Sequence, residues 1–308
     1  MTLEHRGFVE LPAHVGSGGF DHASVHEPTG RIYVAHTAND AVDVIDTDAR
    51  TYMGSIPGLP AVAGALVATA PDLVFTSNRG ENTVGILRPD DLASVDKIGV
   101  GLRPNGLAYD RGRARLLAAH VGDPAIPGSC TVSVVDVRAR KRIADLPVAG
   151  RTRWTVYDPI AEAFHVNIAD PPQIVAVEAG DPIRIRRVAS ISHAGPHGLD
   201  IDVPRRRLFC ACDAAVLLEV DADSGAVLAT EAIAGVPDVV FFNAARSRLY
   251  VAIGDPGVIE VFDTAPLRRR ETVATEAGAH TLSFDATRNI VCAFLPGSHR
   301  AAVYEDHR

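Results

Sequence analysis

The sequence predicts an all-β fold made of seven copies of a four-stranded unit, and two observations carry that prediction. The first is a short apolar phrase that recurs along the 308 residues and ends on an acidic residue in six of its seven copies. The copies end at Asp46, Arg88, Asp136, Glu178, Asp221, Asp263 and Glu305, with spacings of 42, 48, 42, 43, 42 and 42 residues. The second is that every repeat consists of short β-rich segments, which at this period indicates one β-propeller blade per repeat.

The predicted strands follow one another in the same order in each repeat. A glycine-rich entry leads into an apolar strand, a charged turn follows, and a second strand of the type Arg31 to Ala35 comes next. The counterparts of this second strand begin at Leu73, Arg115, Ala163, Arg207, Arg248 and Asn289. The acidic-ended phrase is the third strand, and a fourth such as Tyr52 to Ile56 completes the blade. We therefore expect a seven-bladed β-propeller.

The last blade lacks a fourth strand of its own, because the chain ends three residues after Glu305. We predict that Gly7 to Leu11 from the N-terminus supplies it. This closure pairs the two chain ends and removes a sheet edge that would invite aggregation. No linker interrupts the repeats, so residues 1–308 are expected to form a single domain.

Composition narrows the classes of partner. The net charge of −8 argues against nucleic acid, which would need a basic face. No apolar stretch approaches the roughly 20 residues of a membrane span. The start of the chain, residues 1–7, also lacks the apolar core of a secretion signal. We expect a cytoplasmic protein that does not associate with membranes.

Polar residues gather at one end of the predicted channel. In a propeller the innermost strand of each blade lines the channel and the second strand runs antiparallel beside it, so the first begins where the second ends. We call this end the mouth. Aligning the repeats places at the start of the inner strands His22, Gly64, Asn105, Trp154, His197, Asp238 and His280. The ends of the second strands are His36, Asn78, His120, Asn167, Cys212, Ile253 and Phe294.

Four of these positions form an unbroken arc around the ring: His197, Asp238, His280 and His22. Neutral imidazole suits zinc, copper, iron or nickel, and three protein ligands with an open fourth position are usual for catalytic zinc. We predict a divalent transition metal, with zinc favoured, on His22, His197 and His280. Asp238 is expected to act as fourth ligand or base. In the alternative, each histidine bonds to backbone or water and no metal is present.

The remaining predicted roles are proton transfer and substrate binding. His36 or His120 is expected to move a proton. Arginines flank the other half of the mouth, where a guanidinium cluster would hold a carboxylate bidentately. The predicted substrate-binding residues are Asn78, Arg79, Arg103, Asn105, Arg153, Trp154 and Asn167. They predict a small-molecule substrate that bears a carboxylate. Trp154 either stacks on the substrate or plugs the channel, and the long loop from Val121 to Cys130 is a candidate lid.

Two segments, Ile32 to Asp46 and Val74 to Val84, resemble the YVTN type of β-propeller repeat, which implies the fold but no single activity. The phrases Pro104-Asn105-Gly106-Leu107 and Pro196-His197-Gly198-Leu199 resemble the gluconolactonase and regucalcin group. That resemblance implies a divalent metal at the mouth, although histidine replaces most of the group's acidic and amide ligands and favours a softer ion. Virginiamycin-type lyases are similar in architecture and use histidine at the same mouth.

These expectations converge on a metal-dependent enzyme that hydrolyses a lactone or related ester. The ion would polarise a carbonyl or lower the pKa of a bound water towards about 7. A metal-dependent lyase would use the same site, with a histidine removing an α-proton. The third possibility is a noncatalytic propeller that binds a small ligand or a protein partner.

Overall fold

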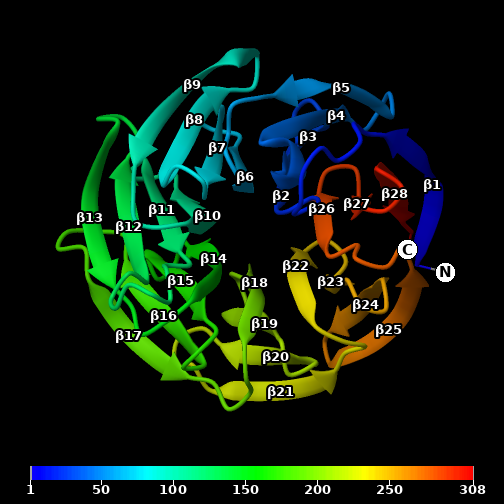
Figure 1. Ribbon diagram of the computed structural model, residues 1–308. Coiled ribbons are helices and arrows are strands. Elements are labelled where there is room, and N and C mark those ends of the chain that lie inside the picture. The colour runs from blue at the N-terminus through cyan, green and yellow to red at the C-terminus, as the bar shows by residue number, and fades with distance from the viewer. Residues whose placement is uncertain (1, 308) are drawn as a thin grey trace.

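The fold is a seven-bladed β-propeller, seen in a computed structural model that describes residues 2–307. Seven antiparallel four-stranded sheets surround a central channel (Figure 1). The prediction of an all-β, seven-bladed propeller is therefore confirmed. Within residues 2–307 no helix is long and apolar enough to cross a membrane.

The strands are described by their position in the blade, taking blades one to seven in chain order. The innermost strands are β2 (Ala23–His26), β6 (Val62–Ala68), β10 (Pro104–Asp110), β14 (Thr152–Asp158), β18 (Pro196–Asp202), β22 (Pro237–Asn243) and β26 (Thr281–Asp285). The second strands are β3 (Arg31–His36), β7 (Leu73–Asn78), β11 (Arg115–His120), β15 (Ala163–Ile168), β19 (Arg207–Cys212), β23 (Arg248–Ile253) and β27 (Ile290–Leu295). The third strands are β4 (Ala41–Asp46), β8 (Thr83–Arg88), β12 (Thr131–Asp136), β16 (Gln173–Glu178), β20 (Val216–Asp221), β24 (Val258–Thr264) and β28 (Arg300–Asp306). The outermost strands are β5 (Thr51–Ile56), β9 (Asp91–Gly99), β13 (Lys141–Pro147), β17 (Ile185–Ser190), β21 (Val227–Ala232), β25 (Leu267–Ala274) and β1 (Leu3–Glu10).

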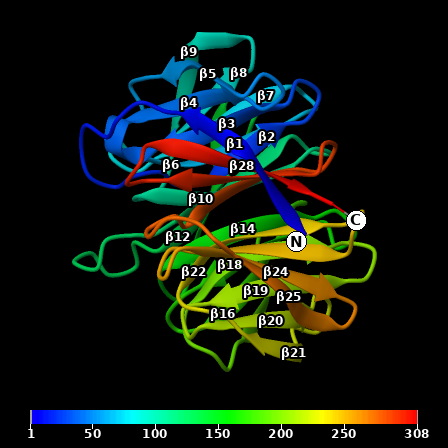
Figure 2. The same ribbon diagram turned by 90° about the vertical axis from the view of Figure 1, so that its right-hand side faces the viewer.

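The N-terminal strand β1 closes the last blade, as predicted. It pairs antiparallel with β28 from Leu3 opposite Asp306 to Glu10 opposite Arg300, so the two chain ends lie side by side (Figures 1 and 2). The strand begins at Leu3, earlier than the predicted start at Gly7, and its register shifts between His5 and Gly7. Closure therefore uses more of the N-terminus than the apolar pattern alone indicated.

Apolar side chains fill the spaces between neighbouring blades. The second and third strands are buried along most of their length, whereas the outermost strands alternate between buried and exposed residues. One core cluster joins Val34 of blade one, Phe294 of blade seven and Val9 of β1. The junction where the ring closes is thus a packed core like the other blade interfaces, which the hydrophobic effect stabilises.

Two connections on the mouth side interrupt the regular pattern. A short 3₁₀ helix, η1 (Thr37–Asn39), follows β3. The loop of residues 121–130 follows β11, and Figure 2 shows it projecting beside β12. Its base is fastened by hydrogen bonds from the Val121 and Gly122 amides to the carbonyls of Arg103 and Leu102. Its role as a lid stays a prediction.

Candidate functional site

The inner strands begin at the mouth with a local irregularity that aims side chains into the channel. In blades three to six the strand's first pairing is followed by a register shift, for example from Pro196 opposite Cys212 to Leu199 opposite Cys210. The residues in these β-bulges leave the regular pairing, and a bulge re-aims its side chains. Asn105, Trp154, His197 and Asp238 occupy the bulges.

Glycine within two of these bulges lets neighbouring blades approach closely. A Cβ added at Gly198 would lie 2.6 Å from the carbonyl oxygen of Asp238, and one at Gly106 would lie 2.5 Å from that of Arg153. Both contacts are too short for any other residue, because the obstructing atoms belong to backbone. The glycines of the Pro-Asn-Gly-Leu and Pro-His-Gly-Leu phrases therefore fix the position of the next blade's site residue.

Asp238 lies at the centre of the predicted arc. Its Oδ1 is 2.9 Å from Nε2 of His197, and its Oδ2 is 3.7 Å from Nε2 of His280. His197 is held on its other side by Asp213, whose Oδ1 is 2.7 Å from Nδ1. Both ring nitrogens of His197 are thus engaged by carboxylates. The structure does bring the four arc residues together, with Asp238 between the histidines.

Asp21 is a site residue that the sequence comparison missed. Its Oδ1 lies 3.2 Å from Nε2 of His22, and one ligand atom each from Asp21, His22 and Asp238 lie within 4.8 Å of one another. All three side chains are largely shielded, with 13%, 8% and 15% of their surfaces exposed. Asp21 precedes the inner strand, so an alignment of strand positions alone did not include it. Its adjacency to His22 was the one available signal.

The ionisation states in the arc differ from residue to residue. Burial lowers the pKa of His22, despite the nearby charges of Asp21 and Asp238, and so favours its neutral imidazole. Burial also disfavours the charged form of His197, but Asp238 and Asp213 outweigh it and raise its pKa to about 9. Although burial opposes ionisation of Asp238, the positive charge of His197 and its hydrogen bond hold the pKa of that carboxyl well below its usual range.

Guanidinium groups flank the arc. Nη2 of Arg79 lies 3.2 Å from Oδ2 of Asp21 and also donates to the side-chain carbonyl of Asn105. Nη2 of Arg153 lies 3.1 Å from Oδ2 of Asp213. On the exposed rim, partial burial together with the charges of Arg153, Arg79 and Arg103 lowers the pKa of Arg151. Four arginines therefore converge on the predicted substrate side of the mouth.

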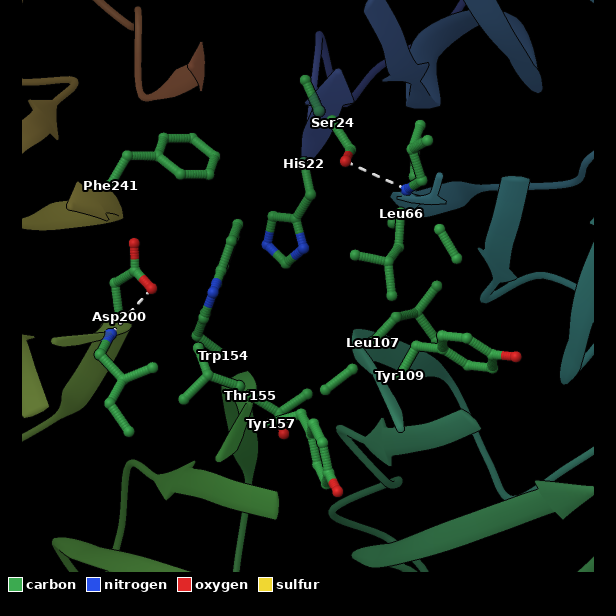
Figure 3. Close-up of a pocket in the computed structure, with 18 of the residues that line it drawn as sticks. His22, Ser24, Leu66, Leu107, Tyr109, Trp154, Thr155, Tyr157, Asp200 and Phe241 are labelled. Atoms are coloured by element: carbon green, nitrogen blue, oxygen red, sulfur yellow. Dashed lines mark hydrogen bonds between the residues drawn. The ribbon is translucent and has the colours of Figure 1, made fainter. Parts of the chain in front are cut away.

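Trp154 and His22 of the arc both line a cavity between the inner strands. The ring centroid of Trp154 lies 4.1 Å from that of His22 and 6.3 Å from that of Phe241, and Figure 3 shows the indole beside His22. The cavity has a volume of about 440 Å³, and of the arc residues only His22 lines it. The cavity extends along the inner strands to Tyr109, Arg111 and Tyr157 at their far ends. Trp154 and His22 therefore lie where the arc meets this cavity.

Asp200 faces this cavity, and its ionisation predicts a pH dependence of stability. Burial raises its pKa to about 6, although the amides of Phe242 and Ile201 donate hydrogen bonds to it. As pH rises from about 4 to about 6, the unfolded chain loses this proton while the folded chain keeps it, so stability falls. The full pKa shift corresponds to roughly 3 kcal/mol of unfolding free energy. This is an upper value, because solvent that enters the cavity would screen the charge.

The measurement is urea unfolding of the protein and of Asp200→Asn from pH 4 to pH 7. The variant loses one backbone hydrogen bond, because an amide has a single acceptor oxygen, and is expected to be less stable at pH 4. The difference in unfolding free energy between the variant and the natural chain should shrink or reverse as pH rises to 7. A difference that does not change with pH would show that Asp200 titrates normally.

The polar row at the ends of the second strands does not reach the arc. His36 is fully buried, with Nδ1 2.7 Å from Oδ2 of Asp43. His120 is also fully buried, with Nδ1 2.7 Å from Oγ1 of Thr131, and burial lowers its pKa to about 4. These side chains turn into their own blades, toward the third strand, so neither is placed to move a proton at the arc.

The two asparagines of this row are buried as well. Asn78 donates to Oγ1 of Thr83 at 3.0 Å, within its own blade. Asn167 donates to the backbone carbonyls of His197 and Gly198 at 2.9 and 3.2 Å. Asn167 therefore supports the strand that carries His197 and does not itself face the mouth. Of the predicted substrate-binding residues, the structure places Arg79, Arg103, Asn105, Arg153 and Trp154 around the mouth.

Comparison with known proteins supports the fold alone. No family model matches the chain, and no curated protein matches it. A chain from a structure titled "Kuenenia stuttgartiensis Hydrazine Synthase" aligns with a TM-score of 0.81 at 11% identity, over 94% of this chain and 97% of that one. A chain from "Crystal Structure of Mitotic Checkpoint Complex" aligns with a TM-score of 0.83 at 10% identity, over 99% and 92%. The narrower resemblance to YVTN repeats stays a prediction.

Proposed function

We propose that this protein is a metal-dependent hydrolase that acts on a lactone or related ester of a small anionic molecule. Its divalent transition metal, with zinc favoured, would be held by Asp21, His22 and Asp238. The observation that carries the proposal is the approach of their ligand atoms to within 4.8 Å of one another in a largely shielded position. Carboxylate oxygen and imidazole nitrogen are both ligands that zinc accepts, and three such ligands leave a position open.

This ligand set differs from the one predicted by aligning the repeats, in which His22, His197 and His280 bound the ion. His197 has no free ring nitrogen, because Asp213 and Asp238 engage both. It is better suited to orient Asp238, as an outer partner that hydrogen-bonds to a ligating carboxylate. Asp21 takes its place among the ligands.

His280 is the residue best placed to act as general base. Its Nδ1 lies 2.7 Å from the carbonyl oxygen of Gly278, to which it donates, so Nε2 keeps its lone pair. That nitrogen is 3.7 Å from Asp238, and 37% of the side chain is exposed. A water positioned between His280 and the ligands could lose its proton to Nε2. The ion, when bound, would supply a Lewis acid and make that water more acidic.

The arginines favour a substrate with negative charge. Arg79 and Arg153 are tied to Asp21 and Asp213, whereas Arg103 and Arg151 lie on the exposed rim beside them. A carboxylate bound by the rim guanidiniums would place the rest of a small molecule over the arc. Arginine is suited to this role because its planar group binds a carboxylate through two parallel hydrogen bonds.

The test combines metal analysis with an internal optical reporter. Trp154 is the only tryptophan, and its ring packs against that of the proposed ligand His22. Co²⁺ added to metal-free protein is expected to quench its fluorescence, and the loaded protein should open lactones bearing a carboxylate faster than uncharged ones. Elimination products in place of hydrolysis products would assign a lyase to the same residues. Failure to bind any ion near Trp154 would refute the enzyme proposal and favour a noncatalytic binding propeller.

A further inference from the structure

A second cluster of histidines lies away from the arc, where the first and last blades meet. His14 is in the loop between β1 and β2, His36 ends β3, and His299 is in the turn between β27 and β28. The ring centroids of His14 and His36 are 4.9 Å apart, and those of His14 and His299 are 4.5 Å apart. The imidazole of His14 therefore lies between those of His36 and His299 and contacts both.

Each of these imidazoles has a buried nitrogen without a hydrogen-bond partner. These atoms are Nε2 of His14, Nε2 of His36 and Nδ1 of His299. Buried polar atoms are rarely left unpaired in proteins, so three in one place point to a missing partner. A water molecule could satisfy one or two of them. A cation that accepts three nitrogen lone pairs would satisfy all of them.

His36 has a carboxylate hydrogen-bonded to one of its ring nitrogens, as metal-binding histidines usually do. Its Nδ1 is 2.7 Å from Oδ2 of the fully buried Asp43, whose Oδ1 accepts a hydrogen bond from Oγ of Ser55 at 2.5 Å. A carboxylate bonded to one ring nitrogen fixes the tautomer and leaves the lone pair on the other. The ring is also held in place by Phe20, whose centroid is 4.5 Å away. His36 is thus oriented with its Nε2 available.

The backbone around the cluster is fastened at several points. The Leu11 amide donates to the carbonyl of His299 at 2.9 Å, and the Val15 amide donates to Oδ1 of Asn39 at 2.8 Å. These bonds hold His14 between η1 and the last blade. The three nitrogens do not converge in this structure: among residues 2–307, three such ligand atoms lie within 4.8 Å of one another only at Asp21, His22 and Asp238. Binding would therefore require the His14 and His299 side chains, which are only partly buried, to turn their free nitrogens toward Nε2 of His36.

We propose that His14, His36 and His299 form a second transition-metal site, of the zinc class, that clasps the N-terminal loop to blades one and seven. Three imidazoles and an outer carboxylate are a donor set that suits zinc, copper or nickel. The ion would link the segment that follows the closing strand to both blades at the ring junction. Its role is structural and independent of the hydrolase proposed at the mouth.

The test is Zn²⁺ binding to the metal-free full-length chain, measured by equilibrium dialysis and elemental analysis. The double variant His14→Gln/His299→Gln changes partly buried side chains and leaves His36 in place. We expect it to bind one Zn²⁺ fewer than the natural chain, or to bind that ion at least about 10- to 100-fold more weakly, the loss that removal of an outer partner alone can cause. His193→Gln changes a partly buried histidine in the connection between β17 and β18; it is the matched control and should bind as the natural chain does.

Variants at the mouth separate the two proposals. If both sites bind, the natural chain takes up two ions, Asp238→Asn loses one, and the double histidine variant loses the other. If only the junction site exists, Asp238→Asn has no effect and the double variant loses the single ion. A natural chain that binds no Zn²⁺, or a double variant that retains every ion of the natural chain, would overturn the junction site. As a second readout, Zn²⁺ should slow proteolysis within residues 11–20 in the natural chain and not in the double variant.

Discussion

A chain lacking residues 1–12 is expected to lose the folded ring altogether. The deletion removes β1 and with it the buried side chains of Leu3, Val9 and Leu11, and it leaves the edge of β28 unpaired. Burial of one large apolar side chain stabilises by roughly 1.5–3 kcal/mol, so three of them approach the roughly 5–15 kcal/mol that stabilises a typical domain. An exposed strand edge would in addition promote aggregation. Circular dichroism and the yield of soluble protein measure the outcome.

Two single substitutions in β1 test whether its buried side chains, and not only its backbone pairing, stabilise the ring. Leu3→Ala removes a side chain that is 1% exposed and packs into the core of blades six and seven, and is expected to cost about 2–5 kcal/mol. Phe8→Ala, on the same strand, removes a side chain that is 48% exposed and should cost about 1 kcal/mol or less. A truncated chain that unfolds cooperatively within a few degrees of the full-length protein would show that closure by β1 contributes little.

The repeat made the fold predictable, but it did not predict the exact extent of the closing strand. The period of the acidic-ended phrase indicated propeller blades, its seven copies gave their number, and closure followed from the missing fourth strand. The segment Leu3 to Arg6 is mostly polar and so did not resemble a strand. It forms one because an outermost strand buries few side chains, and only Leu3 and Val9 of β1 are buried. Gly7, with φ of 126°, accommodates the register shift that lets both halves pair.

The site was predictable where it depends on strand position and unpredictable where it depends on loops and side-chain direction. Alignment placed His22, His197, Asp238 and His280 at one mouth, and the structure brings them together. Asp21 and Asp213 lie just outside the aligned strands, so the repeat contained no signal for them. The row that includes His36 was expected to face the mouth, but its side chains find hydrogen-bond partners within or between blades.

Replacing Asp238 by asparagine is expected to remove both the bound metal and the activity at the mouth. Asparagine has nearly the same shape, so the bulge after Pro237 should persist, but its amide carries no charge. The substitution weakens one of three proposed ligands and leaves His197 without its carboxylate partner. We expect metal affinity and kcat/KM on a carboxylate-bearing lactone each to fall at least about 100-fold, since loss of an outer partner alone costs about 10- to 100-fold.

Charge and geometry at this position can then be distinguished by comparison with two further variants. Asp255→Asn makes the same change on an exposed loop of the same blade and should leave metal content and turnover unchanged. Asp238→Glu restores the carboxylate but moves it by one methylene, so it should regain metal binding in part and little turnover, because catalytic groups must be held within about 0.5 Å of the productive geometry. If Asp238→Asn folds normally and keeps its ion and its activity within about threefold, Asp238 is not a ligand. The carboxylate would then serve only to hold His197, and the ion would have to be bound by other residues of the mouth.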